Sequence, residues 1–247
     1  MGEIMDFIGV SYLHRLWLLI AATNLAVQLL SFYDEKSRRL YVMKKITTPM
    51  LLFGGLIVVT LSTGGFPLIS GTILLAMGLG ELGIEGSQVV EFREREDRAR
   101  TETPWTVTAA GVLFLLVNLF IGIVLLARVD SLQTVLLAAF SGFAAVAIVV
   151  VVIIRTCRPT PETRTQLLAY SGGLAVLAAG AISSLATGLE PLSRAALVLT
   201  VSDSLVLIRM GANWDKRSQA GFRIQLVFLV MISLLYYAFI WLLIRGG

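Results

Sequence analysis

Leu192-SRAALVLTVSDSLVLI-Arg209 is a long apolar segment that carries one carboxylate, Asp203, near its middle. A second apolar segment, Pro67-LISGTILLAMGLGELGI-Glu85, carries Glu81 near its end. Each segment approaches the ~20 apolar residues that a helix needs to cross a bilayer. An ionisable group inside a membrane helix costs roughly 2.5–3.5 kcal/mol on insertion scales. These two carboxylates are therefore the first candidates for chemistry or transport.

The composition places the chain among integral membrane proteins. Its 247 residues are 57% hydrophobic and 15% charged, and the mean hydropathy is +0.85, whereas about 25% of the residues in a soluble domain are charged. We predict an all-α fold, a polytopic membrane helix bundle that forms a single domain over residues 1–247. Continuously apolar runs favour helices over a β-barrel, whose strands alternate apolar and polar residues. Eight transmembrane helices are expected, at residues 13–32, 46–62, 67–84, 104–127, 131–154, 166–187, 190–210 and 222–244.

Basic residues are distributed unequally between the two sides of the predicted bundle. Sixteen of the 20 Lys and Arg residues fall around the loops after spans one, three, five and seven, and four fall on the other side. Because basic loops mark the cytoplasmic side, both termini are expected outside, in the plasma membrane of a prokaryote. The same distribution accounts for the basic charge balance, with attraction to anionic lipid head groups, so no nucleic-acid partner is expected.

The longest basic loop, residues 85–103, contains three acidic residues that each precede an arginine by four positions. Such pairs support a helix by roughly 0.2–0.5 kcal/mol each. The loop is expected to form a solvated helical extension or, alternatively, a surface helix that gates lipid entry. The pairs are Glu91/Arg95, Glu94/Arg98 and Glu96/Arg100.

A short internal match links the third and seventh spans. The segments at 63–68 and 187–192 both read T-G-x-x-P-L, and each precedes a span that carries a carboxylate. Both spans would cross the membrane in the same direction. The match is compatible with two parallel four-helix repeats related by an axis along the membrane normal.

Glu81 and Asp203 are both expected in the cytoplasmic halves of their spans, at comparable depth. If those spans are neighbours, the two carboxylates could share one cavity, with one group protonated and the other ionised. Such a pair is suited to general acid–base catalysis. The alternative is that each carboxylate pairs with a loop arginine or caps a helix.

Other polar residues within the predicted spans have two interpretations. Asn24, Gln28 and Ser31 share one helix face, and buried amides are costly unless they are paired, so this stripe should face the bundle. Such residues either hold helices together by hydrogen bonds or line a substrate pocket. The candidate pocket residues are Asn24, Gln28, Asn118, Thr200, Ser202, Tyr236 and Tyr237, with Ser233 near Tyr237 on the last span.

The sequence pattern argues against several kinds of site. Gly78, Gly80 and Gly83 match the spacing of a dinucleotide motif, but they lie inside a predicted span with no preceding strand. The single histidine, His14, is expected at the outer interface, away from both carboxylates, which argues against a Ser-His-Asp triad. No His/Cys cluster indicates zinc, and the one cysteine, Cys157, cannot form an internal disulfide. We therefore expect neither a metal nor a cofactor.

Together, these residues resemble the lysoplasmalogenase (YhhN-like) family of eight-span membrane proteins, from about residue 40 to the C-terminus. Members carry a glycine–aspartate pair in span three and a serine–aspartate pair in span seven. The corresponding residues here are Gly80-Glu81 and Ser202-Asp203, and Tyr236-Tyr237 is similar to the tyrosine-rich last helix of the family.

The chain departs from the family pattern at three places. Glu81 replaces the aspartate of span three. Thr48-Pro49 stands where members often have Lys-Pro at the start of span two, and Asn118 stands where they often have a histidine in span four.

The resemblance implies hydrolysis of the vinyl-ether bond of a lysophospholipid, which releases a fatty aldehyde. Asp203 and Glu81 would then be the catalytic acid and base, in an order that the sequence leaves open. The residues alone also allow a proton-coupled transporter, because intramembrane carboxylates serve proton transfer in carriers, or a lipid-binding membrane protein without turnover.

Overall fold

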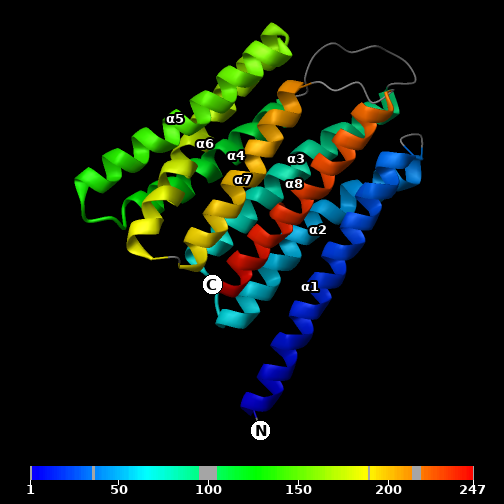
Figure 1. Cartoon of the computed structure of the whole chain (residues 1–247). Helices are drawn as coiled ribbons and strands as arrows, with labels where there is room; N and C mark the ends of the chain where they lie inside the picture. The colour runs from blue at the N-terminus through cyan, green and yellow to red at the C-terminus, as the bar shows by residue number, and fades with distance from the viewer. Residues whose placement is uncertain (1, 35–36, 95–104, 189, 213–217, 247) are drawn as a thin grey trace. The chain divides into compact units, whose positions relative to one another are not determined.

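The computed structural model describes residues 2–34, 37–94, 105–188, 190–212 and 218–246, and nearly all of them are helical (Figure 1). The predicted all-α fold is confirmed for these residues. The helices are α1 (Gly2–Tyr33), α2 (Arg38–Thr63), α3 (Leu68–Glu94), α4 (Trp105–Leu126), α5 (Leu132–Cys157), α6 (Pro161–Thr187), α7 (Pro191–Ala212) and α8 (Gln219–Gly246).

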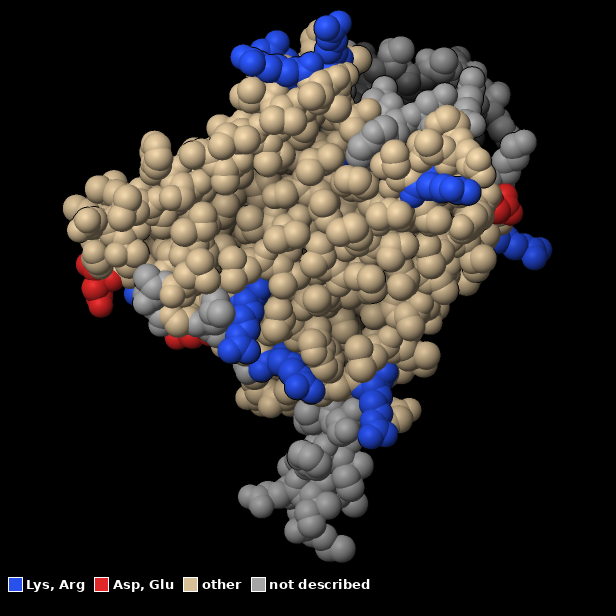
Figure 2. Space-filling view, in the orientation of Figure 1, with Lys and Arg blue, Asp and Glu red and all other residues tan. Residues whose placement is uncertain are grey.

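Among the residues that the structure describes, six helices contain stretches that are long and apolar enough to cross a membrane: α1, α2, α5, α6, α7 and α8. Within the described side chains of α3 and α4, the apolar stretches are shorter, Leu68–Leu82 and Gly111–Leu126. Figure 2 shows that uncharged residues cover most of the face in view, as expected for helices in contact with lipid. A helical membrane bundle is thereby confirmed, whereas the crossing of all eight helices stays a prediction.

Most helices extend beyond their predicted apolar spans, and α1, α2 and α3 do so by the most residues. α1 begins at Gly2 instead of 13, α2 at Arg38 instead of 46, and α3 continues to Glu94 instead of ending at 84. Hydropathy marks only the apolar part of a helix, and polar residues can continue the same hydrogen-bond ladder outside it. The helical extension expected after span three is therefore present as far as Glu94, and its three arginine partners lie outside the described residues.

The start of α2 shows why the second span is longer than expected. The Ser37 side chain accepts a hydrogen bond from the Leu40 backbone N–H at 3.4 Å and caps the helix, which satisfies one of the free donors of the first turn. Pro49 consequently lies inside α2 and not at the start of the helix, and its place near the start of the membrane span stays a prediction. Gly64, with φ of +69°, ends the helix in a left-handed cap.

The described residues form two compact units, each described separately: one extends as far as Phe114, and the other is Leu115–Gly246. In the first unit, α1 packs against α2 and α2 against α3. The indole N–H of Trp17 on α1 donates to the Leu51 carbonyl on α2 at 2.9 Å, and both residues are buried. The prediction of a single domain over 1–247 stays a prediction.

In the second unit, α6 packs against α5 and α7, and α7 packs against α8. Figure 1 shows α6 and α7, coloured yellow and orange, as neighbours in this unit. α4 and α6 approach closely where two glycines meet, because a Cβ added to Gly180 would stand 2.7 Å from the Cα of Gly122. This packing places residues of α4, α6 and α7 around one carboxylate.

Candidate functional site

Asp203 is buried on α7, with 7% of its surface exposed. The Asn118 side chain, on α4, donates a hydrogen bond from Nδ2 to Asp203 Oδ2 at 2.8 Å. Asn118 itself is 2% exposed. The two residues are 85 positions apart, so their contact is made by tertiary packing and joins two candidates that the sequence had marked separately.

Tyr170, on α6, is the third member of this cluster. Its hydroxyl donates a hydrogen bond to the Asp203 carboxylate, and it also shares a hydrogen bond with the Asn118 side chain. Sequence reasoning missed Tyr170. Its position along the helix could have indicated it. Tyr170 lies as far from the start of α6, at Pro161, as Asp203 lies from the end of α7, at Ala212. Because α6 packs against α7, these equal lengths place the two residues at a similar depth.

Glycines on α4 and α6 allow the approach that brings Asn118 to this cluster. Gly122 lies one turn after Asn118 on α4, and an added Cβ there would stand 2.6 Å from the Val176 carbonyl carbon on α6. Gly180 faces Gly122 in the same contact. Small residues that permit close backbone contact are typical of helix interfaces in membranes.

The two tyrosines of α8 have different surroundings. Tyr236 interacts electrostatically with Tyr170, and its ring lies 6.3 Å from that of Phe239. Tyr237 is buried, and its hydroxyl forms a hydrogen bond with Ser233 on the same helix. Tyr236 therefore interacts with one member of the Asp203 cluster, and the pocket-lining role predicted for both tyrosines stays a prediction.

Thr200 and Ser202 precede Asp203 on α7. The Thr200 hydroxyl donates to the Ala196 carbonyl at 2.7 Å, and the Ser204 hydroxyl donates to the Thr200 carbonyl at 2.7 Å. Ser202 is 1% exposed. The Thr200 hydroxyl thus donates its hydrogen bond within its own helix. The roles predicted for Thr200 and Ser202 in a substrate pocket stay predictions.

In the first unit, the polar stripe of α1 faces α2. Asn24 Nδ2 donates to the hydroxyls of Thr47 at 2.8 Å and Thr48 at 3.1 Å, and Gln28 Nε2 donates to Asn24 Oδ1 at 2.8 Å. The predicted orientation toward the bundle is confirmed. The Asn24 contacts join α1 to α2 through neutral groups, which supports the helix-pairing interpretation of Asn24, whereas the Gln28 hydrogen bond lies within α1.

Glu81 lies half-buried on α3, in the first unit. Asp203 belongs to the second unit. The shared acid–base pocket expected for Glu81 and Asp203 therefore stays a prediction, and the Asp203 cluster is built entirely from residues of the second unit.

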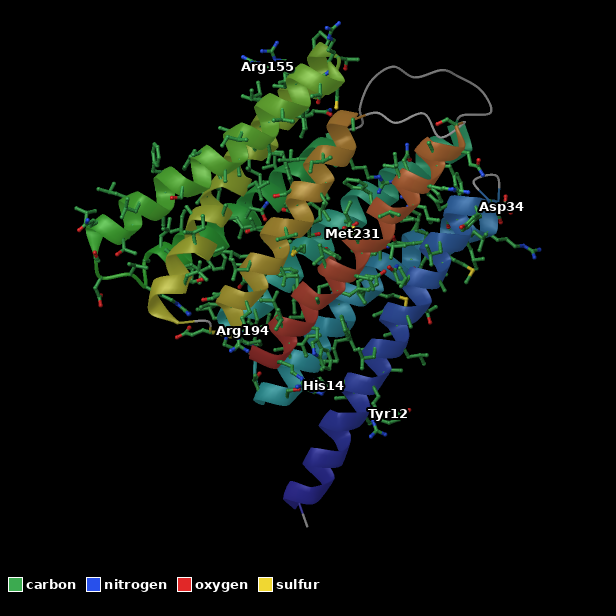
Figure 3. The ribbon with its side chains drawn as sticks, viewed as in Figure 1. Tyr12, His14, Asp34, Arg155, Arg194 and Met231 are labelled. Atoms are coloured by element: carbon green, nitrogen blue, oxygen red, sulfur yellow. The ribbon has the colours of Figure 1, made fainter. Side chains whose placement is uncertain are left out.

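Charged groups of the second unit gather at the ends of its helices. Figure 3 shows Arg155 at the end of α5 and Arg194 near the start of α7, at opposite ends of this unit. Arg128, just after α4, pairs with Glu190, just before α7. Asp203 is instead held by the neutral donors of Asn118 and Tyr170.

The arrangement can hold a carboxyl group and exchange a proton with it. An ionised carboxylate only accepts hydrogen bonds, an amide nitrogen only donates, and a phenol hydroxyl does both. Asn118 can therefore orient Asp203, whereas Tyr170 can orient it and also pass a proton. Within the described residues, no group of three or more His, Cys, Asp or Glu side chains is placed to hold a metal ion.

Comparison with known proteins gives no further assignment. The chain matches no protein-family model, no curated protein and no solved structure.

Proposed function

We propose that the protein is an intramembrane lipid hydrolase that resembles lysoplasmalogenases and cleaves the vinyl-ether bond of a lysophospholipid. The observation that carries the proposal is the buried Asp203 carboxylate, held by hydrogen bonds from Asn118 and Tyr170 on two other helices. A buried carboxyl group oriented by donors is what acid–base catalysis in an apolar medium requires.

The proposed reaction consumes one water molecule. A carboxylic acid gives its proton to the outer vinyl carbon, and the carbon bonded to the ether oxygen becomes an oxocarbenium ion. A carboxylate accepts a proton from water as the water oxygen bonds to that carbon. The resulting hemiacetal loses its hydroxyl proton and breaks its bond to the glycerol oxygen, which takes up a proton, and the products are a fatty aldehyde and a glycerophospho-alcohol. Asp203 and Glu81 supply the two carboxyl groups, in an order that the proposal leaves open.

The proposal includes a membrane placement. All eight helices cross the membrane, both termini lie outside, and the membrane is the plasma membrane of a prokaryote. The clustering of 16 basic residues around the loops of one side supports this orientation. The repeated T-G-x-x-P-L segments support an origin from two parallel four-helix repeats.

The test is aldehyde release from a lysoplasmenyl lipid by the purified full chain in lipid nanodiscs. Asp203→Asn and Glu81→Gln should each lower turnover by about 10²–10⁴-fold, the usual contribution of an acid or base. The exposed Asp130, in the loop after α4, provides the matched control, because Asp130→Asn makes the same chemical change away from the cluster and should leave turnover unchanged.

Three outcomes would end this proposal. They are absence of aldehyde with the wild-type protein, unchanged turnover in both carboxyl variants, and an equal loss in Asp130→Asn. Lipid binding without release of aldehyde would indicate a lipid-binding membrane protein.

One observation favours a second function, that of a proton-coupled carrier. Pro49 lies inside α2, and it has no N–H to donate to the carbonyl of Lys45. Interrupted helices often mark the binding sites of transporters, and Lys45 and Thr48 are buried beside this proline. A carrier predicts proton flux into liposomes that depends on Asp203, with no change in lipid composition.

A further inference from the structure

Tyr170 brings a hydroxyl to Asp203 from another helix. Asn118 Nδ2 donates a hydrogen bond to Asp203 Oδ2 at 2.8 Å, and the Tyr170 hydroxyl forms a second hydrogen bond with the carboxylate. A carboxylate held by a single donor can still rotate about that bond, whereas donors from α4 and α6 together restrict it. The second contact therefore limits the direction in which the carboxyl oxygens point.

Tyr170 also connects the carboxylate to further helices. It shares a hydrogen bond with Asn118 on α4 and interacts electrostatically with Tyr236 on α8. Side chains of α4, α6 and α7 thus meet around Asp203, and Tyr236 of α8 interacts with Tyr170. The hydroxyls of Thr200 and Ser204 on α7 donate to backbone carbonyls of their own helix, so they do not substitute for it.

We propose that Tyr170 is a positioning residue of the site: its hydroxyl holds the Asp203 carboxyl group in the orientation from which protons are transferred. The role in turnover rests on the proposed hydrolase function. The contact itself does not, so the two can be tested separately.

The contact is tested by infrared difference spectroscopy of the full chain in nanodiscs. Asp203→Asn identifies the carboxyl stretching band of Asp203, because that band disappears in the variant. Tyr170→Phe keeps the ring and removes only the hydroxyl, so the band should shift in frequency. Tyr33→Phe is the matched control, because Tyr33 is an exposed tyrosine at the end of α1, and it should leave the band in place. An unshifted band in Tyr170→Phe overturns the proposal.

A reciprocal measurement covers the case in which Tyr170→Phe does not fold. With ring-labelled tyrosine, Asp203→Asn should shift one tyrosine C–O band of the otherwise unchanged protein. If no tyrosine band responds to Asp203→Asn, the proposal fails without any use of the Tyr170 variant.

The role in turnover is tested with the aldehyde assay. Tyr170→Phe should lower kcat about tenfold to a hundredfold, the effect of losing one hydrogen bond to a charged group, and should leave KM nearly unchanged. An unchanged kcat in an active protein would overturn the positioning role. If wild-type protein releases no aldehyde but the Asp203 band shifts in Tyr170→Phe, the hydrolase function fails and the Tyr170 contact stands.

Discussion

A single methyl group added at Gly180 should loosen the contact that places Asn118 beside Asp203. In Gly180→Ala, the new Cβ would stand 2.7 Å from the Cα of Gly122 on α4, whereas non-bonded carbon atoms prefer about 3.5–4.0 Å. The atom that the methyl group meets belongs to the backbone, so no side chain can rotate away. The helices must therefore separate locally by about 1 Å, the difference between these two distances.

Gly172 makes the matched control for this substitution. It lies on the same helix, α6, and a Cβ added there meets no atom within 4 Å. Gly180→Ala and Gly172→Ala gain the same helix propensity, so the difference between them isolates the packing cost. Overpacking of this kind costs about 1–3 kcal/mol, and we expect Gly180→Ala to be less stable than Gly172→Ala by that amount.

The assay is reversible unfolding of the full chain in mixed micelles, followed by circular dichroism as the fraction of denaturing detergent rises. The Asp203 carboxyl band provides a second measurement, because separation of α4 from α6 should also disturb the Asn118 contact. If Gly180→Ala is as stable as Gly172→Ala and the band is unmoved, the close approach of α4 and α6 does not hold the site together.

Two further predictions concern buried polar contacts and use the same unfolding assay. Asn118→Leu removes the amide donor of Asp203 and should lower the free energy of unfolding by about 1–3 kcal/mol, and Asn118→Leu/Asp203→Leu should recover part of that loss because no buried polar partner remains. Strictly additive losses in the double variant would contradict the coupling. Asn24→Leu should destabilise by about 1–3 kcal/mol, whereas Thr23→Val on the exposed face of α1 should change stability by about 0.5 kcal/mol or less. Equal effects at positions 23 and 24 would contradict the role of Asn24 between α1 and α2.

Hydropathy located every helix of the described chain because lipid exposure and burial both select apolar residues. It could not locate their ends, since a helix continues wherever its backbone bonds continue, as α3 does to Glu94 and α2 does from Arg38. The Ser37 cap was readable from sequence as a serine three residues before Leu40. The cap was missed because the basic residues between Ser37 and the second span were assigned to a loop.

The sequence was enough to predict the buried carboxylate of the candidate site, but not the hydrogen bonds that hold it. Asp203 was conspicuous because an acid in an apolar helix is rare, and Asn118 was conspicuous as an amide in span four. Their contact depends on where α4 lies relative to α7, which no local pattern encodes. Tyr170 gave a weaker signal, since a tyrosine in a membrane helix is common at the interface and costs little.

The polar cluster around Asn24 and the cluster around Asp203 differ in a way that bears on function. Asn24, Thr47 and Thr48 are neutral, lie on neighbouring helices and satisfy one another, as helix-pairing residues do. The Asp203 cluster instead buries a group that can carry a charge, and a well-packed apolar replacement for such a group is often neutral or stabilising. Packing alone would therefore favour leucine at this position. The donors from α4 and α6, and the glycines that let those helices approach, surround Asp203, and the stability of the fold does not explain a carboxylate there. That is the physical reason for the proposal that Asp203 takes part in catalysis.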